Sequence, residues 1–299
     1  MPVSIVIPTY RREQVLLDTI RYLHALHPPP DEIVIVDQSE LHEPTTTEAL
    51  QTWHQDGRIF WVRLAQPSIT HAMNTGLTQA RSEIVLFLDD DIIPDSNLIA
   101  AHARAQGEDN CNIVAGQVLQ PGEEVLAEPP AKGEFLFRSG QRAWVRELMG
   151  GNFSVKKATA FKLGGFDENF VRVAYRFEAE FCDRAITAGE KILFEPAASI
   201  RHLKAGAGGT RSFGEHLTTI KPHHAVGAYY FMLRARHIKR RWWQMLLRPL
   251  RAVRTRHHLR RPWWIPLTLA AEFGGFAWAL ALRFREPKLI RGRPAGAAK

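Results

Sequence analysis

The sequence has only two cysteines among its 299 residues, Cys111 and Cys182. Two thiols this far apart exclude a disulfide framework and a zinc site built mainly from cysteine. The N-terminus also lacks a basic stretch followed by an apolar one, so the sequence predicts no signal peptide and a cytoplasmic catalytic body. Hydrophobic residues make up 45% of the chain and charged residues 23%, which excludes a disordered or low-complexity protein.

Acidic residues are almost absent from the last part of the chain. Residues 221–299 contain 18 lysines and arginines but only Glu272 and Glu286, which gives a net charge of +16. Residues 1–220 contain 21 basic and 29 acidic residues, a net charge of −8. We therefore expect a catalytic domain over residues 1–220 and a basic helical tail over residues 221–299. A tail of this charge favours phosphate-bearing partners, either nucleic acid or anionic lipid.

The tail is also rich in tryptophan. Five of the eight tryptophans lie in it: Trp242, Trp243, Trp263, Trp264 and Trp278. Tryptophan beside arginine is typical of a bilayer interface, where the ring lies at the level of the lipid headgroups. RNA binding through base stacking is the second interpretation. We expect a membrane surface and no nucleic acid, because the tail also contains an apolar run at residues 263–282.

The apolar run at residues 263–282 is long enough to span a bilayer. It contains Pro266, Glu272 and two adjacent glycines, and arginines flank it on both sides. A single span would place one basic flank outside, against the positive-inside tendency, whereas a helix in the interface satisfies both flanks. A helix packed on the catalytic body is a further alternative. We favour peripheral association with the inner face of the plasma membrane.

Strand and helix patterns alternate along the first ninety residues. Short β-branched runs predict strands at 3–7, 33–36, 59–64 and 84–88, and helical spacing predicts helices at 12–26, 46–55 and 69–80. This alternation predicts βαβ units, and hence an α/β fold with a mostly parallel sheet. A helix is expected at 97–106 and a loop from there to residue 146. Structure resumes at 150–156, with a helix at 178–188 and a strand at 192–194.

Polar side chains follow three of the predicted strands. Thr9 and Tyr10 follow the first strand, Asp37 the second, and Asp89, Asp90 and Asp91 the fourth. Ligands bind beyond the carboxyl ends of the strands in such sheets. The sequence lacks the G-x-G-x-x-G motif after the first strand, so a dinucleotide fold of that type is not indicated.

Three adjacent aspartates repel one another unless a cation neutralises them. Carboxylate oxygens suit Mg²⁺ or Mn²⁺, and magnesium commonly shares its coordination shell with substrate phosphates. A nucleoside diphosphate is therefore the natural co-ligand. The alternative is a solvated loop in which Asp95 or Ser96 caps the next helix. The position directly after a buried strand favours the metal site.

Several motifs together resemble family 2 glycosyltransferases, which have the GT-A fold. The segments that carry the resemblance are VSIVIPTYR at 3–11, EIVIVD at 32–37, Asn74-x-Gly76, FLDDDIIP at 87–94, GNFS at 151–154 and GGFDE at 164–168. They occur in the family's order and spacing, and the resemblance covers residues 1–211. It implies a nucleotide-diphospho-sugar transferase with a Rossmann-like, mostly parallel sheet, to which the basic helical tail is appended.

The resemblance also implies roles for individual residues on the donor side. The donor nucleotide sugar would be bound by these residues: Pro8, Thr9, Tyr10, Arg11, Asp37, Asn74, Asp89, Asp90 and Arg211. Asp91 would coordinate the metal, Asp89 would support both the metal and the ribose, and His202 would add a further metal contact. Gln38 stands where a second aspartate is common in the family, so the resemblance leaves open which nucleotide base the donor carries.

The family's catalytic base lies before a helical arginine, which by resemblance is Arg184 here. This alignment places Glu178 at the base position, with Phe177 in place of the usual preceding acid, and Glu180 as the alternative base. Phe177 can desolvate Glu178 and raise its pKa, which suits a general base. Residues two apart on a helix diverge by about 200°, so the two glutamates cannot both face one acceptor.

These residues predict an inverting, metal-dependent transfer of a sugar to a hydroxyl acceptor. Gly151, Asn152 and Trp144 are expected to border that acceptor, which can be lipid-linked in cell-surface polysaccharide or glycolipid synthesis. A sugar nucleotidyltransferase is the second enzymatic interpretation, although residues 10–13 lack the expected glycine-rich loop. A non-catalytic module that binds membrane or RNA is the third, and it leaves the acids at successive strand ends unexplained.

Overall fold

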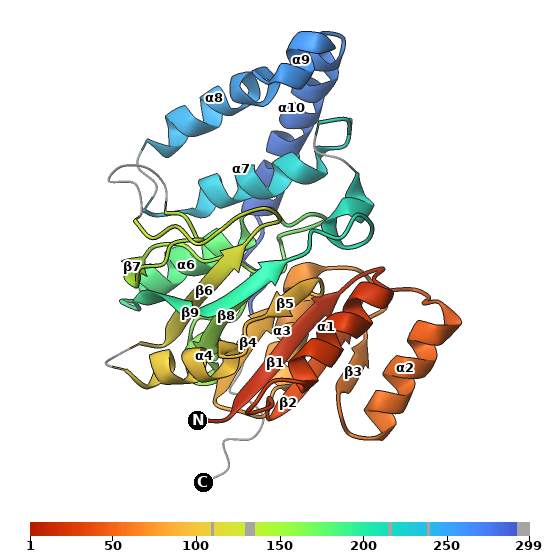
Figure 1. Ribbon diagram of the computed structural model, residues 1–299. Coiled ribbons are helices and arrows are strands. Elements are labelled where there is room, and N and C mark those ends of the chain that lie inside the picture. The colour runs from red at the N-terminus through yellow and green to blue at the C-terminus, as the bar shows by residue number, and fades with distance from the viewer. Residues whose placement is uncertain (109–110, 129–134, 215–216, 238–239, 292–299) are drawn as a thin grey trace.

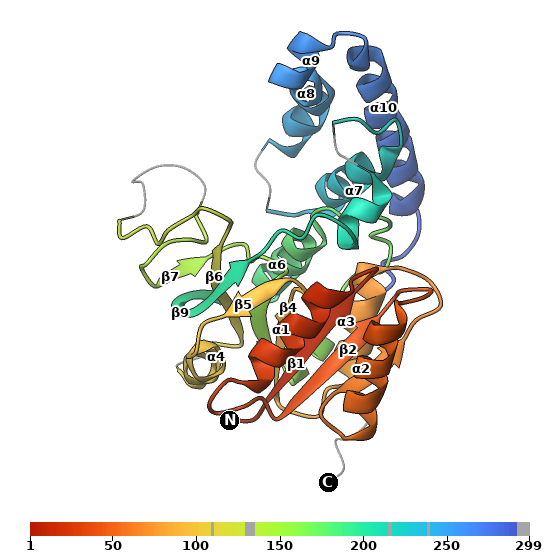
Figure 2. The same ribbon diagram turned by 45° about the vertical axis from the view of Figure 1, so that its right-hand side comes forward.

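The computed structural model describes residues 1–108, 111–128, 135–214, 217–237 and 240–291. Its centre is one mixed sheet with helices on both faces (Figures 1 and 2). The first part of the chain forms β1 (Val3–Thr9), α1 (Gln14–His24), β2 (Glu32–Asp37), α2 (Pro44–Gln55), β3 (Phe60–Arg63), α3 (Ile69–Gln79) and β4 (Ile84–Leu88). All seven elements were predicted, and each end lies within two residues of the expected position.

The second part of the sheet is less regular. Its elements are β5 (Ile92–Pro94), α4 (Leu98–Gly107), β6 (Ile113–Leu119), β7 (Ala143–Val145), β8 (Asn152–Lys156), α5 (Lys157–Lys162), α6 (Phe177–Thr187) and β9 (Ile192–His202). The prediction of a continuous loop from 107 to 146 was wrong, because β6 and β7 lie in it. The strand predicted at 192–194 is the beginning of the much longer β9.

Strand β6 escaped prediction because Gly116 and Gln117 interrupt its apolar run. All seven of its residues are nevertheless buried. A side chain at position 116 would place its Cβ 2.2 Å from Nδ2 of Asn152, so only glycine fits there. The Gln117 amide donates to the carbonyl of Ser139 and accepts from the hydroxyl of Ser199, which satisfies its polar atoms inside the sheet.

The strand order, among the described residues, is β3-β2-β1-β4-β8-β6-β9-β5, with β7 paired to β9. Strands β1 to β4, β6 and β9 run in one direction, and β5, β7 and β8 run against them. The sheet is therefore mostly parallel, as predicted. The carboxyl ends of β1, β2, β4 and β9 meet along one edge, and His202 pairs with Ile92 immediately beyond Asp91.

Each face of the sheet has its own core. Ile5 and Ile7 of β1 pack with α1, α2 and α4, whereas Val6, between them, packs with α3 and α6 on the other face. This alternation follows from the two-residue period of a strand. The second core continues into the tail, because it includes Tyr229 and Tyr230 of α7 (Ala225–Arg234). The first tail helix is thus packed on the catalytic body.

The rest of the tail forms a helical lobe that projects from the body (Figure 1). The 3₁₀ turns η1 (Gly209–Phe213) and η2 (Pro222–His224) lead to α7, and the lobe itself consists of α8 (Arg241–Val253), α9 (Arg256–Arg260) and α10 (Trp264–Arg283). Helix α10 packs along α7 so closely that a Cβ at Gly275 would lie 2.6 Å from that of Ala225. Glu272 of α10 is buried and accepts hydrogen bonds from Tyr229 (2.8 Å) and Arg248 (3.2 Å).

Helix α10 corresponds to the apolar run identified in the sequence. By length and composition, it is the one helix of the described ranges that could cross a membrane. Its most apolar 18 residues have a mean hydropathy of 1.5, and 28% of them are buried. Beyond it the chain returns to the body, where Ile290 donates its backbone N–H to the carbonyl of Gly164 (2.8 Å). Lys288 likewise donates to the Asp167 carboxylate (2.9 Å). These contacts fix the base of the lobe.

Candidate active site

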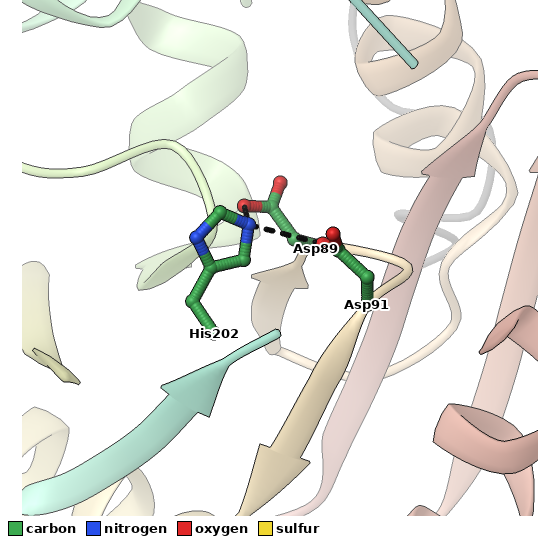
Figure 3. A group of neighbouring side chains, drawn as sticks. All are labelled: Asp89, Asp91 and His202. Atoms are coloured by element: carbon green, nitrogen blue, oxygen red, sulfur yellow. Dashed lines mark ion pairs between the residues drawn. The ribbon is translucent and has the colours of Figure 1, made fainter. Parts of the chain in front are cut away.

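Asp89, Asp91 and His202 form a cluster of potential metal ligands at the carboxyl edge of the sheet (Figure 3). One ligand atom from each of the three lies within 4.8 Å of the others. Nε2 of His202 is 3.0 Å from Oδ1 of Asp91 and 3.8 Å from Oδ2 of Asp89. The cluster forms because β4 ends at the aspartates and β9 ends at the histidine.

The orientation of His202 is set by Gln120, which lies just beyond β6. Nδ1 of His202 donates to Oε1 of Gln120 at 3.0 Å, so Nε2 is left to face the two carboxylates. Histidine ligands in metal sites commonly hold their second ring nitrogen in this way. Two hard carboxylate oxygens and one imidazole nitrogen form a donor set that suits Mn²⁺ or Mg²⁺.

The charges of the cluster support one another. Burial by itself would raise the pKa of Asp91. Hydrogen bonds from His202 and from the backbone N–H of Ala205, together with the positive charges of His202 and Arg12, lower that pKa. Burial likewise opposes protonation of His202, yet its hydrogen bond to Asp91 and the charge of Asp89 raise its pKa. Asp91 is thus held ionised in a place that attracts positive charge.

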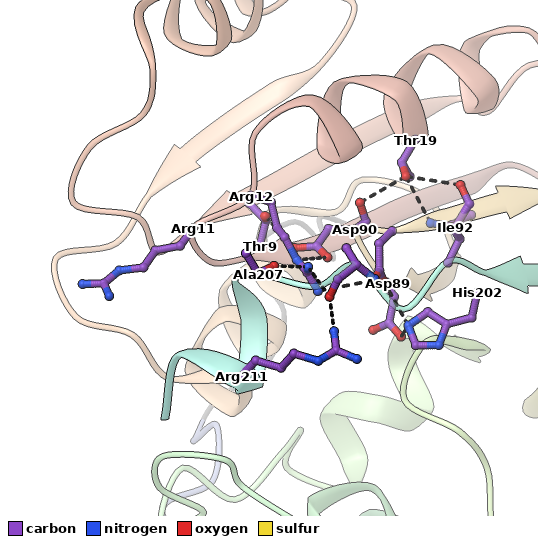
Figure 4. A network of polar contacts seen from close by, with 12 residues as sticks. Thr9, Arg11, Arg12, Thr19, Asp89, Asp90, Ile92, His202, Ala207 and Arg211 are labelled. Carbon is purple, nitrogen blue, oxygen red and sulfur yellow. Dashed lines mark hydrogen bonds and ion pairs between the residues drawn. The ribbon is translucent and has the colours of Figure 1, made fainter. Parts of the chain in front are cut away.

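Asp90, the middle aspartate, has a different environment (Figure 4). Its carboxylate accepts hydrogen bonds from Thr9 (2.7 Å) and from Nε of Arg12 (3.1 Å), so both of its oxygens are engaged. Arg12 also reaches Asp91 through Nη2 at 3.3 Å, and it is itself buried. The structure therefore places Asp90 and Thr9 in a support behind the ligand cluster. Their predicted contact with the donor stays a prediction.

A loop from β9 to η1 covers this edge of the sheet. Ala205 donates its backbone N–H to Asp91 (2.8 Å), and its carbonyl accepts from both Arg12 and Arg211. Gly209 donates its N–H to the carbonyl of Tyr10 at 2.7 Å. Arg211 therefore lies on the covering loop beside the ligand cluster (Figure 4), and its predicted contact with the donor stays a prediction.

The same loop brings an aromatic ring against the end of β1. Phe213 stacks on Tyr10 with 6.1 Å between ring centroids and 25° between planes. Arg11 has φ = 54° and forms an exposed ion pair with Glu40, so its side chain leaves the cluster, as Figure 4 shows. Pro8 pairs with Val36 inside the sheet. Tyr10 is thus the member of this segment that faces the covering loop.

Two of the residues expected to bind the donor nucleotide sugar, Asp37 and Asn74, are buried. Asp37 is fully buried, and it accepts from the N–H of Ser39 (2.9 Å) and the indole of Trp61 (3.1 Å) and lies 2.9 Å from Nε2 of His42. Asn74 is also buried, and its amide forms paired hydrogen bonds with the backbone of Phe166, both at 2.8 Å. Asp37 and Asn74 therefore hold neighbouring segments in place, and their predicted contact with the donor is not tested.

Glu178 lies in the first turn of α6, and Gly150 and Gly151 lie between it and Asp89. A Cβ at Gly150 would lie 3.8 Å from Oε1 of Glu178, and a Cβ at Gly151 would lie 2.1 Å from Oδ2 of Asp89. The two glycines thus leave the space between base and cluster open. Oε2 of Glu178 is buried and has no hydrogen-bond partner among the described residues. Burial raises the pKa of Glu178 to about 7, to which the charge of Asp89 contributes.

Glu180, the alternative base, has a structural environment instead. It is 5% exposed and forms two hydrogen bonds with Arg184, at 2.7 and 2.9 Å. Arg184 also donates to the carbonyls of Leu163 and Gly165, which ties α6 to the preceding segment. The structure therefore leaves Glu178, of the two glutamates, with a carboxylate oxygen that lacks a partner.

Two of the predicted acceptor residues lie elsewhere. The Asn152 side chain is fully buried, donates to the carbonyls of Gln117 and Ala198, and is 3.0 Å from Nε2 of His102, so it holds strands together and cannot contact an acceptor. Trp144 pairs with Leu193 near the beginning of β9, whereas His202 is at its other end. The burial of the Asn152 side chain contradicts its predicted contact with the acceptor, whereas the contact predicted for Trp144 is not tested. Gly151 does lie beside Asp89.

Arg12 and Gln120 were missed by the sequence analysis. Arg12 compensates two of the three aspartates, and Gln120 orients the histidine. A signal for Arg12 existed, because a basic residue directly after the first strand is placed at the same sheet edge as the aspartates. The sequence carried no comparable signal for Gln120, since it lies in a stretch interpreted as a loop.

Comparison with known proteins identifies the family. The sequence profile described as "Glycosyl transferase family 2" matches residues 4–167, more than half of the chain. The chain belongs to glycosyl transferase family 2. This family 2 chain is 25% identical over 118 residues to "Uncharacterized glycosyltransferase YfnE" of Bacillus subtilis (strain 168), which covers 39% of this chain and 30% of that protein.

A second curated relative is "Probable glycosyltransferase YdaM" of Bacillus subtilis (strain 168), 21% identical over 212 residues, which are 66% of this chain and 49% of that protein. The matches of the family 2 chain thus cover 30% and 49% of the lengths of these two relatives.

Solved structures confirm the fold. S. aureus TarS 1-349 in complex with UDP-GlcNAc has a TM-score of 0.59 at 14% identity, over 95% of this chain and 92% of that one. The mannosyltransferase PcManGT from Pyrobaculum calidifontis, in complex with GDP-Man and Mn²⁺, has a TM-score of 0.58 at 21% identity, over 94% and 77%. The family 2 chain therefore has the GT-A fold of these glycosyltransferases, as its sequence predicted.

Proposed function

We propose that this protein transfers a sugar from a nucleoside-diphosphate sugar to a hydroxyl acceptor, with inversion at the anomeric carbon. One observation carries the proposal: a cluster of potential metal ligands lies on one side of Gly150 and Gly151, and on the other lies Glu178, whose Oε2 is buried without a hydrogen-bond partner among the described residues. The donor diphosphate would lie over the cluster and the acceptor hydroxyl at Glu178. Family membership and the nucleotide-sugar complexes of TarS and PcManGT support this arrangement.

A divalent ion, Mg²⁺ or Mn²⁺, would be held by Asp91, Asp89 and His202. Their donor atoms are close enough to share one ion, and Gln120 already orients the imidazole. Mn²⁺ is present in PcManGT and in a further similar structure, GalNAc-T7 with UDP, GalNAc and Mn²⁺ (TM-score 0.57, 16% identity), which supports a divalent ion of this kind. Bound there, the ion would neutralise the negative charge that develops on the departing diphosphate.

The remaining steps belong to side chains of the chain itself. Glu178 accepts the proton of the acceptor hydroxyl while the acceptor oxygen forms its bond to the anomeric carbon. The bond from that carbon to the diphosphate breaks on the opposite side, and its electron pair leaves with the nucleoside diphosphate. Arg211, which bonds to the carbonyl of Ala205 on the covering loop, would pair with the released phosphate charge. Attack from the opposite side inverts the configuration.

A turnover assay tests the proposed function. The protein is incubated with a panel of nucleotide sugars in Mn²⁺ or EDTA, and released nucleoside diphosphate is measured. We expect release that depends on Mn²⁺ and disappears in Asp91→Ala, but persists in Asp56→Asn, an exposed acid at the end of α2. Formation of pyrophosphate would favour a sugar nucleotidyltransferase instead. No turnover with any donor would contradict the proposal.

We also propose that the lobe of α8, α9 and α10 binds the anionic, cytoplasmic face of the plasma membrane. Apolar side chains on α8 are unusually exposed: Trp242 57%, Trp243 64%, Leu246 68% and Leu250 59%. Arginines share the same helix, and the tail as a whole carries a net charge of +16. Exposed tryptophan and leucine with arginine is the combination that lies in a lipid headgroup region.

Helix α10 fits the interfacial interpretation better than a span. Its Glu272 and Gly275 are buried against α7 and α8, so one side of the helix is committed to protein contacts. Its other side carries exposed Leu267 and Phe273. A lobe that lies on the membrane would bring the site close to a lipid-linked acceptor in surface polysaccharide or glycolipid synthesis.

A further inference from the structure

Trp144 lies on the catalytic body, toward the end of the sheet that is remote from the ligand cluster. It pairs with Leu193 near the beginning of β9, whereas His202 ends that strand, so about 30 Å of strand lies between them. The Trp144 side chain is nevertheless 57% exposed. The proposed sugar transfer gives no reason for a large exposed ring at this place.

Strands β7 and β9 run side by side here and present two different faces (Figure 1). Trp144 of β7 and Leu193 of β9 are directly paired and so share one face. Residues two positions away along either strand lie on that same face: Arg142, Lys191 and Glu195. Phe194 is on the other face and packs in the core against Phe135, with 4.7 Å between ring centroids. One face of this pair of strands is therefore core, and the other carries an aromatic ring among charged groups.

The charged groups around the ring compensate one another. Arg142 forms ion pairs with Glu108, just beyond α4, and with Glu195, whose Oε2 lies 3.3 Å from its Nε. Nζ of Lys191 lies 5.4 Å from the centre of the Trp144 ring, which is a cation–π contact. Two cations and two carboxylates give this surface no net charge, yet they place N–H donors and carboxylate acceptors next to one another.

A cavity of about 520 Å³ opens beside the ring. Its lining combines the buried, apolar side chains of Cys111 and Leu193 with the exposed groups of Trp144, Arg142 and Glu108. Sites for small molecules have volumes of about 300–1,000 Å³ and combine an apolar lining with a few polar groups. The size and the lining of this cavity both match that description.

The combination of groups indicates the class of ligand. One side of a sugar ring presents C–H groups of partial positive charge, and the face of an indole ring is negative. Sugar hydroxyls both donate and accept, so they can bond to carboxylates and to guanidinium groups at once. An apolar ligand would desolvate the charged groups without giving them partners, and an anion would meet cations that are already compensated.

We propose that Trp144 and the cavity beside it form a second carbohydrate site, which binds a neutral oligosaccharide outside the active site. The sugar ring would stack on the indole, and its hydroxyls would bond to Arg142 and Glu108. This inference goes beyond the proposed sugar transfer and does not depend on it, because the site shares no residue with the ligand cluster or with Glu178. A glycan bound there stays with the protein whether or not a donor is present.

NMR of the indole N–H groups tests the inference on the full chain. The Trp144 signal is the one that disappears in Trp144→Phe. The probes are cellohexaose, maltohexaose, mannohexaose and chitohexaose, which are neutral, and hexagalacturonate, which is anionic. We expect at least one neutral probe to shift the Trp144 signal and to bind with a dissociation constant of about 1 mM or tighter, and hexagalacturonate to bind more weakly than that probe.

Calorimetry with the best neutral probe then assigns the binding to the ring. Trp144→Ala should weaken it at least about ten-fold, the scale expected for a central contact residue, and Trp144→Phe should retain part of the affinity. Both changes are at an exposed position, so they spare the fold. Trp242→Ala removes an equally exposed ring from the helical lobe and should keep the full affinity. Glu178→Gln should keep it too, which separates this site from the active site.

Three results would overturn the inference. If no neutral probe shifts the Trp144 signal, the cavity is not a site for neutral glycans. If the affinity is unchanged in Trp144→Ala, the glycan binds elsewhere on the protein. Binding of hexagalacturonate alone would show that the ligand is an anion. None of these measurements involves turnover, so a failure of the proposed sugar transfer would appear separately.

Discussion

Nδ1 of His202 donates a hydrogen bond to Oε1 of Gln120 at 3.0 Å, while Nε2 of the same ring faces Asp91. The histidine is therefore oriented before any cation arrives. Such preorientation matters because replacing a residue that orients a metal-binding histidine commonly lowers the metal affinity about 10- to 100-fold.

Gln120→Ala should weaken Mn²⁺ binding by about ten-fold, because the imidazole loses the acceptor that fixes its orientation. Calorimetric titration of Mn²⁺ in the presence of UDP measures this directly. Gln141→Ala, which removes an exposed amide that bonds only to the carbonyl of Ala127 among the described residues, serves as the control. Equal Mn²⁺ affinity in all three proteins would show that Gln120 has no such role.

Arg12→Met should destabilise the protein by about 3 kcal/mol, because it leaves two buried carboxylates without their cation. Arg12 pairs with Asp90 at 3.1 Å and with Asp91 at 3.3 Å. Urea unfolding gives the free energy, and the double variant Arg12→Met/Asp90→Asn should recover part of the loss. A single variant as stable as the unmodified protein would contradict the importance of this ion-pair network.

The rate of sugar transfer should rise with pH through about 7, since Glu178 must be ionised to accept a proton and burial raises its pKa to about 7. Glu178→Gln should lower turnover by about 10²- to 10⁴-fold with little change in UDP affinity. Glu180→Gln should reduce stability by disrupting the ion pair with Arg184, but should keep the pH profile. The opposite pattern would make Glu180 the base.

The same pKa predicts a change in stability. A carboxyl whose pKa is raised in the folded state binds its proton more tightly when folded, so its contribution favours folding below about pH 4.5 and is lost as the pH rises through about 7. Glu178→Gln should therefore melt at a higher temperature than the unmodified protein at pH 8 and at a similar one at pH 4.5. Equal melting at both pH values would argue against a buried charge at this position.

Binding to the membrane should depend on the exposed side chains of α8. Trp242→Ala/Trp243→Ala should bind vesicles of phosphatidylglycerol and phosphatidylcholine at least about ten-fold more weakly, because two rings leave the headgroup region. Trp144→Ala is a matched control, since Trp144 and Trp242 are both 57% exposed but Trp144 lies on the catalytic body. Vesicle sedimentation that is the same for both variants would contradict the proposed lobe surface.

The regular half of the fold was readable from the sequence because its signals are local. Ile84–Leu88 is a fully buried apolar run that stops at three aspartates, so strand, sheet edge and ligand cluster follow from neighbouring residues. Strand β6 was not readable in this way. Its Gly116 and Gln117 are explained by contacts with Asn152, Ser139 and Ser199, which lie far away in the sequence.

The site was predictable where the residue type determines the chemistry. It was less predictable where the direction of a side chain or the pairing of a strand decides which residues meet. Asp89, Asp91 and His202 are brought together as their chemistry indicated. Asn152 belongs to a motif of the family, yet its side chain is buried among strand carbonyls, because successive residues of a strand face opposite sides. The position of Trp144 relative to the ligand cluster depends on which end of β9 its strand pairs with, and no local sequence pattern reveals that pairing.

The most direct test of the account is the effect of Mn²⁺ on nucleotide affinity. Calorimetry with UDP, GDP and dTDP should show at least one nucleotide that binds ten-fold or more tightly with Mn²⁺ than with EDTA, and the difference should disappear in Asp91→Ala and persist in Asp56→Asn. If Mn²⁺ changes the affinity for none of the three nucleotides, then Asp89, Asp91 and His202 do not hold an ion on a donor diphosphate.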